Sequence, residues 1–248
     1  MLGGMSAQLG TVTALWRYPV KAMLGERLRA ADLTAHGLAG DRRLALLDPE
    51  SGEFVTAIQA RLYQTVLRCA AALDEAGGTR ITLPDGGGTH STAPDVDAVL
   101  SGHVGRPVTL APTPVPASLF EGAPVHLLTT ATLKRLAAEN PRGLAEPERY
   151  RPNLLIDTGG DGFVENHWIG REVRVGDEAV LRVAAGTPRC AIPTFVHGAL
   201  PRDPEALRVI RRANAVPARP GRDPEPIAGV YAEVVRAGRI AEGDPVRA

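Results

Sequence analysis

The chain has 248 residues, of which 44% are apolar and 23% charged, the composition of an ordinary soluble globular protein. Lys and Arg balance Asp and Glu at 28 each, so no basic surface for nucleic acid or an anionic membrane is indicated. The first residues lack the pattern of a secretory signal, and no apolar stretch is long enough to span a membrane. We therefore expect a cytoplasmic protein that binds neither nucleic acid nor membrane.

The first part of the chain is predicted to consist of short strands. Val12–Tyr18 is rich in residues that favour strands, and residues 43–56 contain a turn with Pro49 and Gly52 in the positions typical of a hairpin. Thr79–Leu83, which is followed by a glycine-rich turn, repeats this pattern. The apolar stretch Val66–Leu73 indicates a further strand.

A proline-rich stretch, Pro107–Pro116, separates this part from the rest of the chain. Proline fixes φ and donates no backbone hydrogen bond, so such a stretch suits a connector. We therefore expect two domains, 8–106 and 107–248.

The second part combines two helices with several strands. Thr129 or Thr130 can cap a helix that ends near Asn140, and Asp203-Pro204 can begin another that ends with Arg211-Arg212. The predicted strands are 153–157, 173–176, 179–183 and 229–235, with a last one at 243–246. Because strands outnumber helices and do not alternate with them regularly, we expect a strand-rich α+β or barrel-like fold.

Two cysteines, Cys69 and Cys190, are too few to build an iron–sulfur cluster or a four-thiolate zinc site. The six histidines lie far apart and include no zinc-binding pair. Cys190 follows Arg189 in a predicted loop, and a neighbouring positive charge favours the thiolate form that acts as a nucleophile or binds soft metals. Cys69 lies within a predicted strand, where a cysteine is usually a small buried apolar residue.

Several short motifs occur in order over nearly the whole chain. They are Trp16–Lys21, Gly37–Arg43, Tyr150–Asn153, Phe163–Trp168, Pro188–Cys190 with Pro193-Thr194, Gly229–Tyr231 and Gly243–Val246. The first two resemble the start of the MOSC N-terminal β-barrel domain, and the others resemble the MOSC domain itself. The resemblance extends to the mitochondrial amidoxime-reducing component and to bacterial reductases of N-hydroxylated compounds. It implies a MOSC-type β-barrel with flanking helices plus an N-terminal β-barrel-like domain.

This resemblance implies a molybdenum cofactor, a molybdopterin whose dithiolene holds the metal. Cys190 would be the catalytic residue and the thiolate ligand of molybdenum. The resemblance assigns the cofactor-binding residues as follows: Lys21, Arg42 and Arg151 at the phosphate and pterin, Asn153, Thr129 and Thr130 as hydrogen-bonding groups, and Arg189 beside the thiolate. Relatives often carry serine after the lysine of the first motif, and this chain has Ala22 there, which puts one cofactor hydrogen bond in doubt.

The implied activity is that of a molybdenum-dependent oxidoreductase that reduces N-hydroxylated or related small substrates. Because two cysteines cannot form an iron–sulfur relay, electrons would come from a separate ferredoxin-like or flavin-containing partner. An alternative is a carrier that hands over molybdenum cofactor, or sulfur as a Cys190 persulfide, without turnover. A descendant that binds no cofactor is a third possibility. Pyridoxal phosphate is not expected, because neither Lys21 nor Lys134 lies in a Schiff-base setting.

Overall fold

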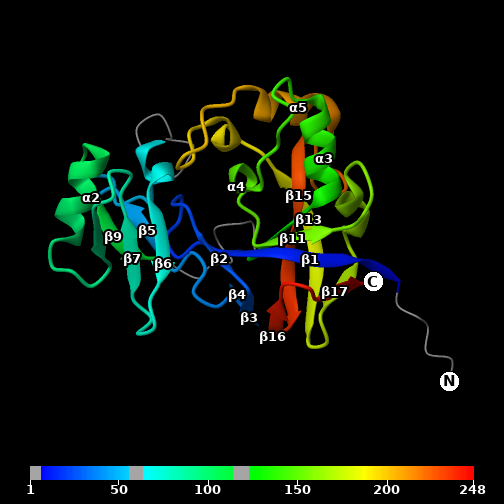
Figure 1. Ribbon diagram of the computed structural model, residues 1–248, viewed down its shortest axis with the longest axis horizontal. Helices are drawn as coiled ribbons and strands as arrows, with labels where there is room; N and C mark the ends of the chain where they lie inside the picture. Colours follow the sequence, from blue (N-terminus) through cyan, green and yellow to red (C-terminus); the bar gives the residue numbers. More distant parts are fainter. Residues whose placement is uncertain (1–6, 56–63, 114–122) are drawn as a thin grey trace.

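The computed structural model describes residues 7–55, 64–113 and 123–248, which form a larger and a smaller unit (Figure 1). In chain order, the strands are β1 (Gln8–Arg17), β2 (Glu26–Leu28), β3 (Ala30–Thr34), β4 (Gly37–Leu38), β5 (Leu44–Leu47), β6 (Ala70–Leu73), β7 (Thr79–Thr82), β8 (Gly88–His90), β9 (Thr109–Pro112), β10 (Val125–Thr129), β11 (Leu154–Asp157), β12 (Glu172–Val175), β13 (Ala179–Pro188), β14 (Ala215–Pro217), β15 (Pro224–Arg236), β16 (Gly238–Ala241) and β17 (Pro245–Arg247). The α-helices are α2 (Val96–Val104), α3 (Thr130–Glu139), α4 (Pro147–Tyr150) and α5 (Glu205–Ala213), and the 3₁₀ helices are η2 (Gln64–Arg68), η4 (Val164–Trp168) and η5 (Ile192–Thr194).

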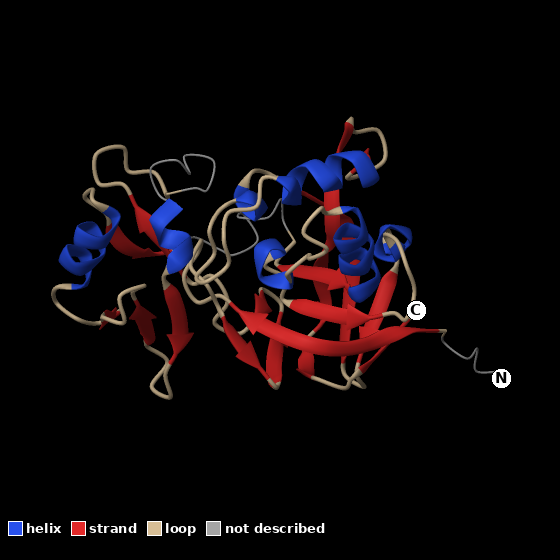
Figure 2. Cartoon of the chain, turned by 45° about the horizontal axis from the view of Figure 1, so that its top comes forward, coloured by secondary structure: helices blue, strands red, loops and turns tan. Residues whose placement is uncertain are grey.

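The larger unit is a closed barrel, formed within the described residues by seven strands in the order β10-β11-β1-β17-β12-β13-β15. Pairing of β15 with β10 closes the ring, while β14 pairs with the start of β15 and β2 pairs with β1. Figure 2 shows the strands of both units in red and the helices in blue. The pair β10–β11 is parallel, and the other pairs of the ring are antiparallel. The strand-rich fold with a β-barrel, predicted from the sequence, is confirmed.

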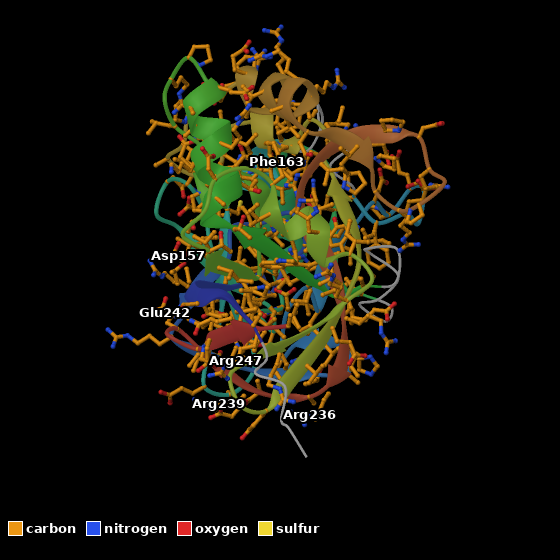
Figure 3. All side chains as sticks on the ribbon, turned by 90° about the vertical axis from the view of Figure 1, so that its right-hand side faces the viewer. Asp157, Phe163, Arg236, Arg239, Glu242 and Arg247 are labelled. Atoms are coloured by element: carbon orange, nitrogen blue, oxygen red, sulfur yellow. The ribbon has the colours of Figure 1, made fainter. Side chains whose placement is uncertain are left out.

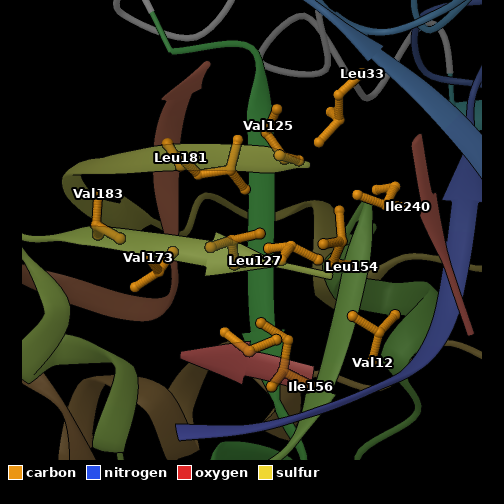
Figure 4. Packing of buried hydrophobic residues seen from close by; sticks show 14 of the residues in the cluster. Val12, Leu33, Val125, Leu127, Leu154, Ile156, Val173, Leu181, Val183 and Ile240 are labelled. Carbon is orange, nitrogen blue, oxygen red and sulfur yellow. The ribbon is translucent and has the colours of Figure 1, made fainter. Parts of the chain in front are cut away.

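The inside of the barrel is filled by branched aliphatic side chains. Alternate residues of each strand point inward, so strands rich in Val, Leu and Ile supply one continuous apolar core. Figure 4 shows Val12, Val125, Leu127, Leu154, Ile156, Val173, Leu181 and Val183 meeting there, each at most 1% exposed. The low aromatic content of the chain is consistent with this packing.

Helices α3 and α5 lie at one end of the barrel, at the top of Figure 1. Thr129 caps α3 by accepting a hydrogen bond from the backbone of Thr132, and Pro204 precedes α5, so both predicted helices are confirmed. Their apolar faces share a small core that includes Leu136 and Ile210.

The smaller unit holds the two-stranded sheet β5-β9 and the three-stranded sheet β6-β7-β8, together with α2. Its core includes Met23, Leu46, Ile81 and Leu100. The prediction of one strand over Val66–Leu73 is wrong in its first part, because η2 precedes the strand and Cys69 lies between them. This stretch is apolar because it enters the core. It is too short for its hydrophobic periodicity to distinguish a helical turn from a strand.

The first part of the chain contributes to both units. Strand β1 lies inside the barrel sheet between β11 and β17, and β3 pairs with β16 near the end of the chain. The proline-rich stretch predicted as a connector begins in the described residues, but positions 114–116 lie outside them. The division at residues 106 and 107 stays a prediction.

The outer surface of the barrel is polar, as Figure 3 shows for Arg236, Arg239, Glu242 and Arg247. Several of these charges are paired, for instance Arg27 with Glu242 at 3.0 Å. In the part of the chain that the structure describes, no helix has the length and apolar character needed to cross a membrane.

Candidate functional site

A cavity of about 140 Å³ lies where the two units meet. Four basic residues and one cysteine line it together with apolar and aromatic side chains. The lining residues are Lys21, Ala22, Arg42, His126, Tyr150, Arg151, Pro188, Arg189, Cys190, Ile192 and Tyr231. The structure thus brings together Lys21, Arg42, Arg151 and the neighbouring pair Arg189-Cys190, which come from distant parts of the sequence.

Two arginines of this cavity stack on one buried tyrosine. The guanidinium carbons of Arg42 and Arg151 lie 4.7 and 4.3 Å from the ring centroid of Tyr18. The Tyr18 hydroxyl donates to the carbonyl of Pro152 at 3.1 Å. The backbone carbonyl of Tyr18 accepts a hydrogen bond from the backbone N–H of Arg42 at 2.7 Å. Cation–π contacts with the same ring hold two like charges close together.

The backbone of the cavity wall is strained. Among the described residues, Ala22, Arg42 and Arg151 are the three non-glycine residues with positive φ, at 67°, 50° and 55°. All three line the cavity. The left-handed region costs a residue with a side chain about 1–2 kcal/mol, and such costs persist where the surrounding structure enforces them, often at functional sites.

An ion pair and a hydrogen bond hold the side chain of Arg42 in place. Asp41 forms an ion pair with Arg42, and its other carboxylate oxygen accepts a bond from the Tyr18 backbone at 2.7 Å. The side-chain oxygen of Asn153 accepts from Arg42 at 3.3 Å and from the backbone of His126 at 3.1 Å. Asn153 is fully buried and does not line the cavity, so it acts on the site by positioning Arg42.

Cys190 is the one cysteine among the described residues that line the cavity. It is exposed and free, whereas Cys69 is buried in the core of the smaller unit, as expected from its apolar surroundings. The neighbouring Arg189 donates to the carbonyl of Tyr150 at 2.8 Å, and its guanidinium carbon lies 5.7 Å from the Tyr150 ring centroid. An exposed thiol beside a fixed guanidinium is the setting of a reactive or metal-binding cysteine.

Burial and the neighbouring positive charges lower the pKa values of several basic groups in the cavity. Burial, together with the charge of Arg42, lowers the pKa of Arg151 to about 10 and also lowers the pKa of Lys21. Burial lowers the pKa of Arg189 too. Burial and the nearby Arg189 lower the pKa of His126 to about 3, so this histidine is neutral at pH 7. An anion in the cavity would offset these penalties.

Two donor groups of the cavity residues lack partners. Nη1 of Arg151 and Nε of Arg189 are buried and have no hydrogen-bond partner in the structure. Guanidinium groups only donate hydrogen bonds, so each of these atoms can be satisfied only by an acceptor. A buried donor left without a partner costs about 1–3 kcal/mol, which an acceptor-rich ligand would recover.

The structure places Thr129 and Thr130 away from the cavity wall. Thr129 caps α3 and donates to the buried carboxylate of Glu165 at 2.7 Å. Thr130 donates to the exposed Asp157 at 2.8 Å. Their role in cofactor binding, like that of Asn153, stays a prediction.

Sequence reasoning missed Tyr18, His126 and Tyr231 as residues of the site. Tyr18 and Tyr231 belong to motifs noted in the sequence, but nothing local indicated that one would stack on two arginines and the other line the cavity. His126 gave no signal, because a single histidine in a buried strand is ordinary. In the described ranges, no group of three His, Cys, Asp or Glu side chains could hold a metal ion by itself.

Comparisons with known proteins identify the family of the chain. The model of the MOSC domain matches residues 102–247, and that of the MOSC N-terminal beta barrel domain matches residues 9–102. Mitochondrial amidoxime reducing component 2 of Homo sapiens is 26% identical, over 96% of this chain and 83% of that protein. Mitochondrial amidoxime-reducing component 1 of Mus musculus is 28% identical, over 96% of this chain and 82% of that protein.

Among solved structures, the YuaD protein of Bacillus subtilis shares the fold, with a TM-score of 0.51 at 13% identity over 98% of this chain and 97% of that one. The matched family models together span nearly the whole described chain. The chain therefore belongs to the MOSC family and combines a MOSC domain with a MOSC N-terminal β-barrel domain.

Proposed function

We propose that the chain binds a molybdenum cofactor in the cavity and reduces N-hydroxylated compounds. The observation that carries the proposal is the convergence of an exposed thiol, four basic side chains and three strained backbone positions on one cavity. The relatives named above reduce amidoximes according to their names, which supports the same class of substrate for this chain.

The residues present fit the chemistry of such a cofactor. Its phosphate and pterin offer acceptor atoms, and the unpartnered donors of Arg151 and Arg189 require acceptors. The cavity volume of about 140 Å³ is below that of a typical pocket for a whole ligand, so it suits one end of a larger molecule. Lys21, Arg42 and Arg151 would hold the anionic and polar groups, and Cys190 would supply the thiolate for the metal.

The chain's own residues would bind and orient the reactants. When bound, the cofactor supplies a metal that changes oxidation state as the substrate loses an oxygen atom. Tyr18 and Asn153 keep Arg42 facing the cavity, and Arg189 remains beside the sulfur through its bond to Tyr150. Because Cys190 is exposed, a small substrate can approach it from solvent.

We also propose that a separate ferredoxin-like or flavin-containing protein supplies the electrons, since the sequence has two cysteines and lacks the ligands for an iron–sulfur relay. The cytoplasm is the compartment that we propose for this reaction. Neither the partner nor the compartment is needed for the first test of the activity.

The test uses protein expressed with abundant molybdate in a host that makes the cofactor. We expect the loaded protein to convert benzamidoxime to benzamidine with dithionite-reduced viologen as the electron donor. The Cys190→Ser variant should be inactive, and Cys69→Ala serves as the matched control. If loaded wild-type protein forms no amidine with any chemical donor, the reductase proposal is wrong. A stable persulfide on Cys190 without bound metal, found by mass spectrometry, would favour the carrier instead.

A further inference from the structure

Arg149 is a fully buried arginine outside the cavity, and the function proposed above does not use it. It lies in α4, directly before Tyr150 and Arg151, which line the cavity. Its exposed fraction is 0%, and it forms an ion pair with Glu146 at 2.7 Å. A buried ion pair is costly to desolvate and contributes little stability by itself, so its other contacts indicate its role.

The guanidinium of Arg149 binds the segment that follows Cys190. It donates to the carbonyls of Pro193 and Phe195, both at 3.3 Å, and to that of Pro201 at 2.9 Å. Apart from the single turn η5, this segment has no helix or strand to fix its course. The planar guanidinium, with several donors in fixed directions, satisfies three carbonyls of this segment at once, in addition to the segment's own backbone bonds.

The residue before Cys190 is bound by the same helix. Arg189 donates to the carbonyl of Tyr150 at 2.8 Å. Thus Arg149 and its neighbour Tyr150 hold the chain on both sides of Cys190, and the next residue, Arg151, belongs to the cationic wall. The position of the sulfur relative to the cations of the cavity therefore depends on α4.

We infer that Arg149 is a positioning residue that keeps the sulfur of Cys190 facing the basic cavity. This inference rests on the proposed function only in taking Cys190 as the reactive thiol. Without the guanidinium, the three carbonyls of residues 193–201 would have to find water as a partner. The segment would then move outward and carry the sulfur away from Arg151 and Lys21.

The test compares how fast Cys190 reacts with a neutral and with an anionic alkylating agent. Iodoacetamide and iodoacetate both form an S–C bond to the thiolate and release iodide, so the ratio of their rates reports the electrostatic potential at the sulfur. General loop mobility changes both rates together and leaves the ratio unaltered. Mass spectrometry of the Cys190 peptide in the protein without cofactor gives both rates, and Cys69 stays unreactive because it is buried.

In the wild-type protein we expect iodoacetate to be favoured by at least about threefold relative to free N-acetylcysteine, because a positive cavity concentrates the anion. In Arg149→Lys the ratio should fall toward that of the free thiol. Arg142→Lys is the matched control, since Arg142 pairs with the same Glu146 at 2.8 Å and has no hydrogen bond to residues 193–201 in the structure. It should keep the wild-type ratio.

An unchanged ratio in folded Arg149→Lys would overturn the inference, and so would a wild-type ratio equal to that of the free thiol. If Arg149→Lys does not fold, the Glu146→Gln variant provides the test, because it keeps the guanidinium but removes its charged partner. We expect its iodoacetate-to-iodoacetamide rate ratio to fall below the wild-type value, though by less than in Arg149→Lys. A ratio equal to that of the wild type would overturn the inference. None of these measurements uses cofactor or substrate, so their outcome is separate from that of the amidoxime assay.

Discussion

The inside of the barrel and the cavity between the two units differ in how far their polar and charged groups find partners. Inside the barrel, side chains such as Leu127 and Leu181 are fully buried among other aliphatic groups, with nothing left to bind. In the cavity, like charges lie close together, three backbone positions are strained and two buried donors have no partner. The barrel stabilises the fold, whereas the cavity is held in a costly arrangement that a ligand would relieve.

The two cysteines give the sharpest form of this comparison. Cys190→Ser should lower amidoxime reduction by at least about 100-fold, because hydroxyl is a poor replacement for a thiolate ligand. Its thermal stability should stay close to that of the wild type, since the side chain is exposed. Cys69→Ser should have the opposite effects, with activity per folded molecule retained and stability lower by about 1–3 kcal/mol from a hydroxyl in an apolar core. Equal activity losses in the two variants would contradict the assignment.

Substitutions within each region should separate stability from binding in the same way. Leu127→Ala should lower the free energy of unfolding by about 2–5 kcal/mol through the cavity it creates. Arg151→Met should change it by no more than about 1 kcal/mol, since it removes a buried charge that has like-charged neighbours. Urea denaturation measures both values. Metal analysis should show at least about tenfold less molybdenum in Arg151→Met than in the wild type, and no such loss in Leu127→Ala. A large loss of stability in Arg151→Met would show that the cavity is structural.

The acid dependence of stability should depend on His126. Burial, assisted by Arg189, lowers the pKa of His126 from 6.5 to about 3 in the folded protein. Between these pH values the unfolded chain binds a proton that the folded chain does not, so the free energy of unfolding falls as the pH drops from 6.5 toward 3. His126→Leu should reduce this fall by about 3 kcal/mol, measured by denaturation at pH 7 and pH 4. The control variant His36→Leu changes an exposed histidine and should keep the wild-type pH dependence of stability. If His126→Leu and His36→Leu show the same pH dependence, the prediction is wrong.

The smallest effect is expected at Ala22, whose φ is 67°. Glycine adopts this conformation freely, but its unfolded state has more entropy, so Ala22→Gly should stabilise the protein by less than about 1 kcal/mol. Ala137→Gly, within helix α3, should destabilise it by about 1 kcal/mol. Denaturation of the two variants gives the comparison. If Ala22→Gly is as destabilising as Ala137→Gly, the strain attributed to the cavity wall is not present.

The sequence was sufficient to predict elements that depend on local chemistry. The cap at Thr129 and the start of α5 after Pro204 follow from nearby residues, and the fold class followed from the motifs. Strand pairing was not predictable in the same way. That β1 lies between β11 and β17 depends on contacts between residues more than a hundred positions apart.

The candidate site shows the same division. The motifs indicated Lys21, Arg42, Arg151 and Cys190, and the structure places all four in one cavity. They did not indicate the stacking of Arg42 and Arg151 on Tyr18, because the two arginines meet this ring only in the folded chain. The buried amide of Asn153 accepts a hydrogen bond from Arg42, and its predicted contact with the cofactor stays a prediction.

The central claim is that the cavity binds a molybdenum cofactor through Cys190. Its most direct test is the molybdenum and pterin content of protein purified from cells grown with abundant molybdate, for the wild type, Cys190→Ser and Cys69→Ala. We predict close to one molybdenum and one pterin per chain in the wild type and in Cys69→Ala, and a clear loss of molybdenum in Cys190→Ser. A wild-type protein without molybdenum, or equal metal content in all three proteins, would contradict it.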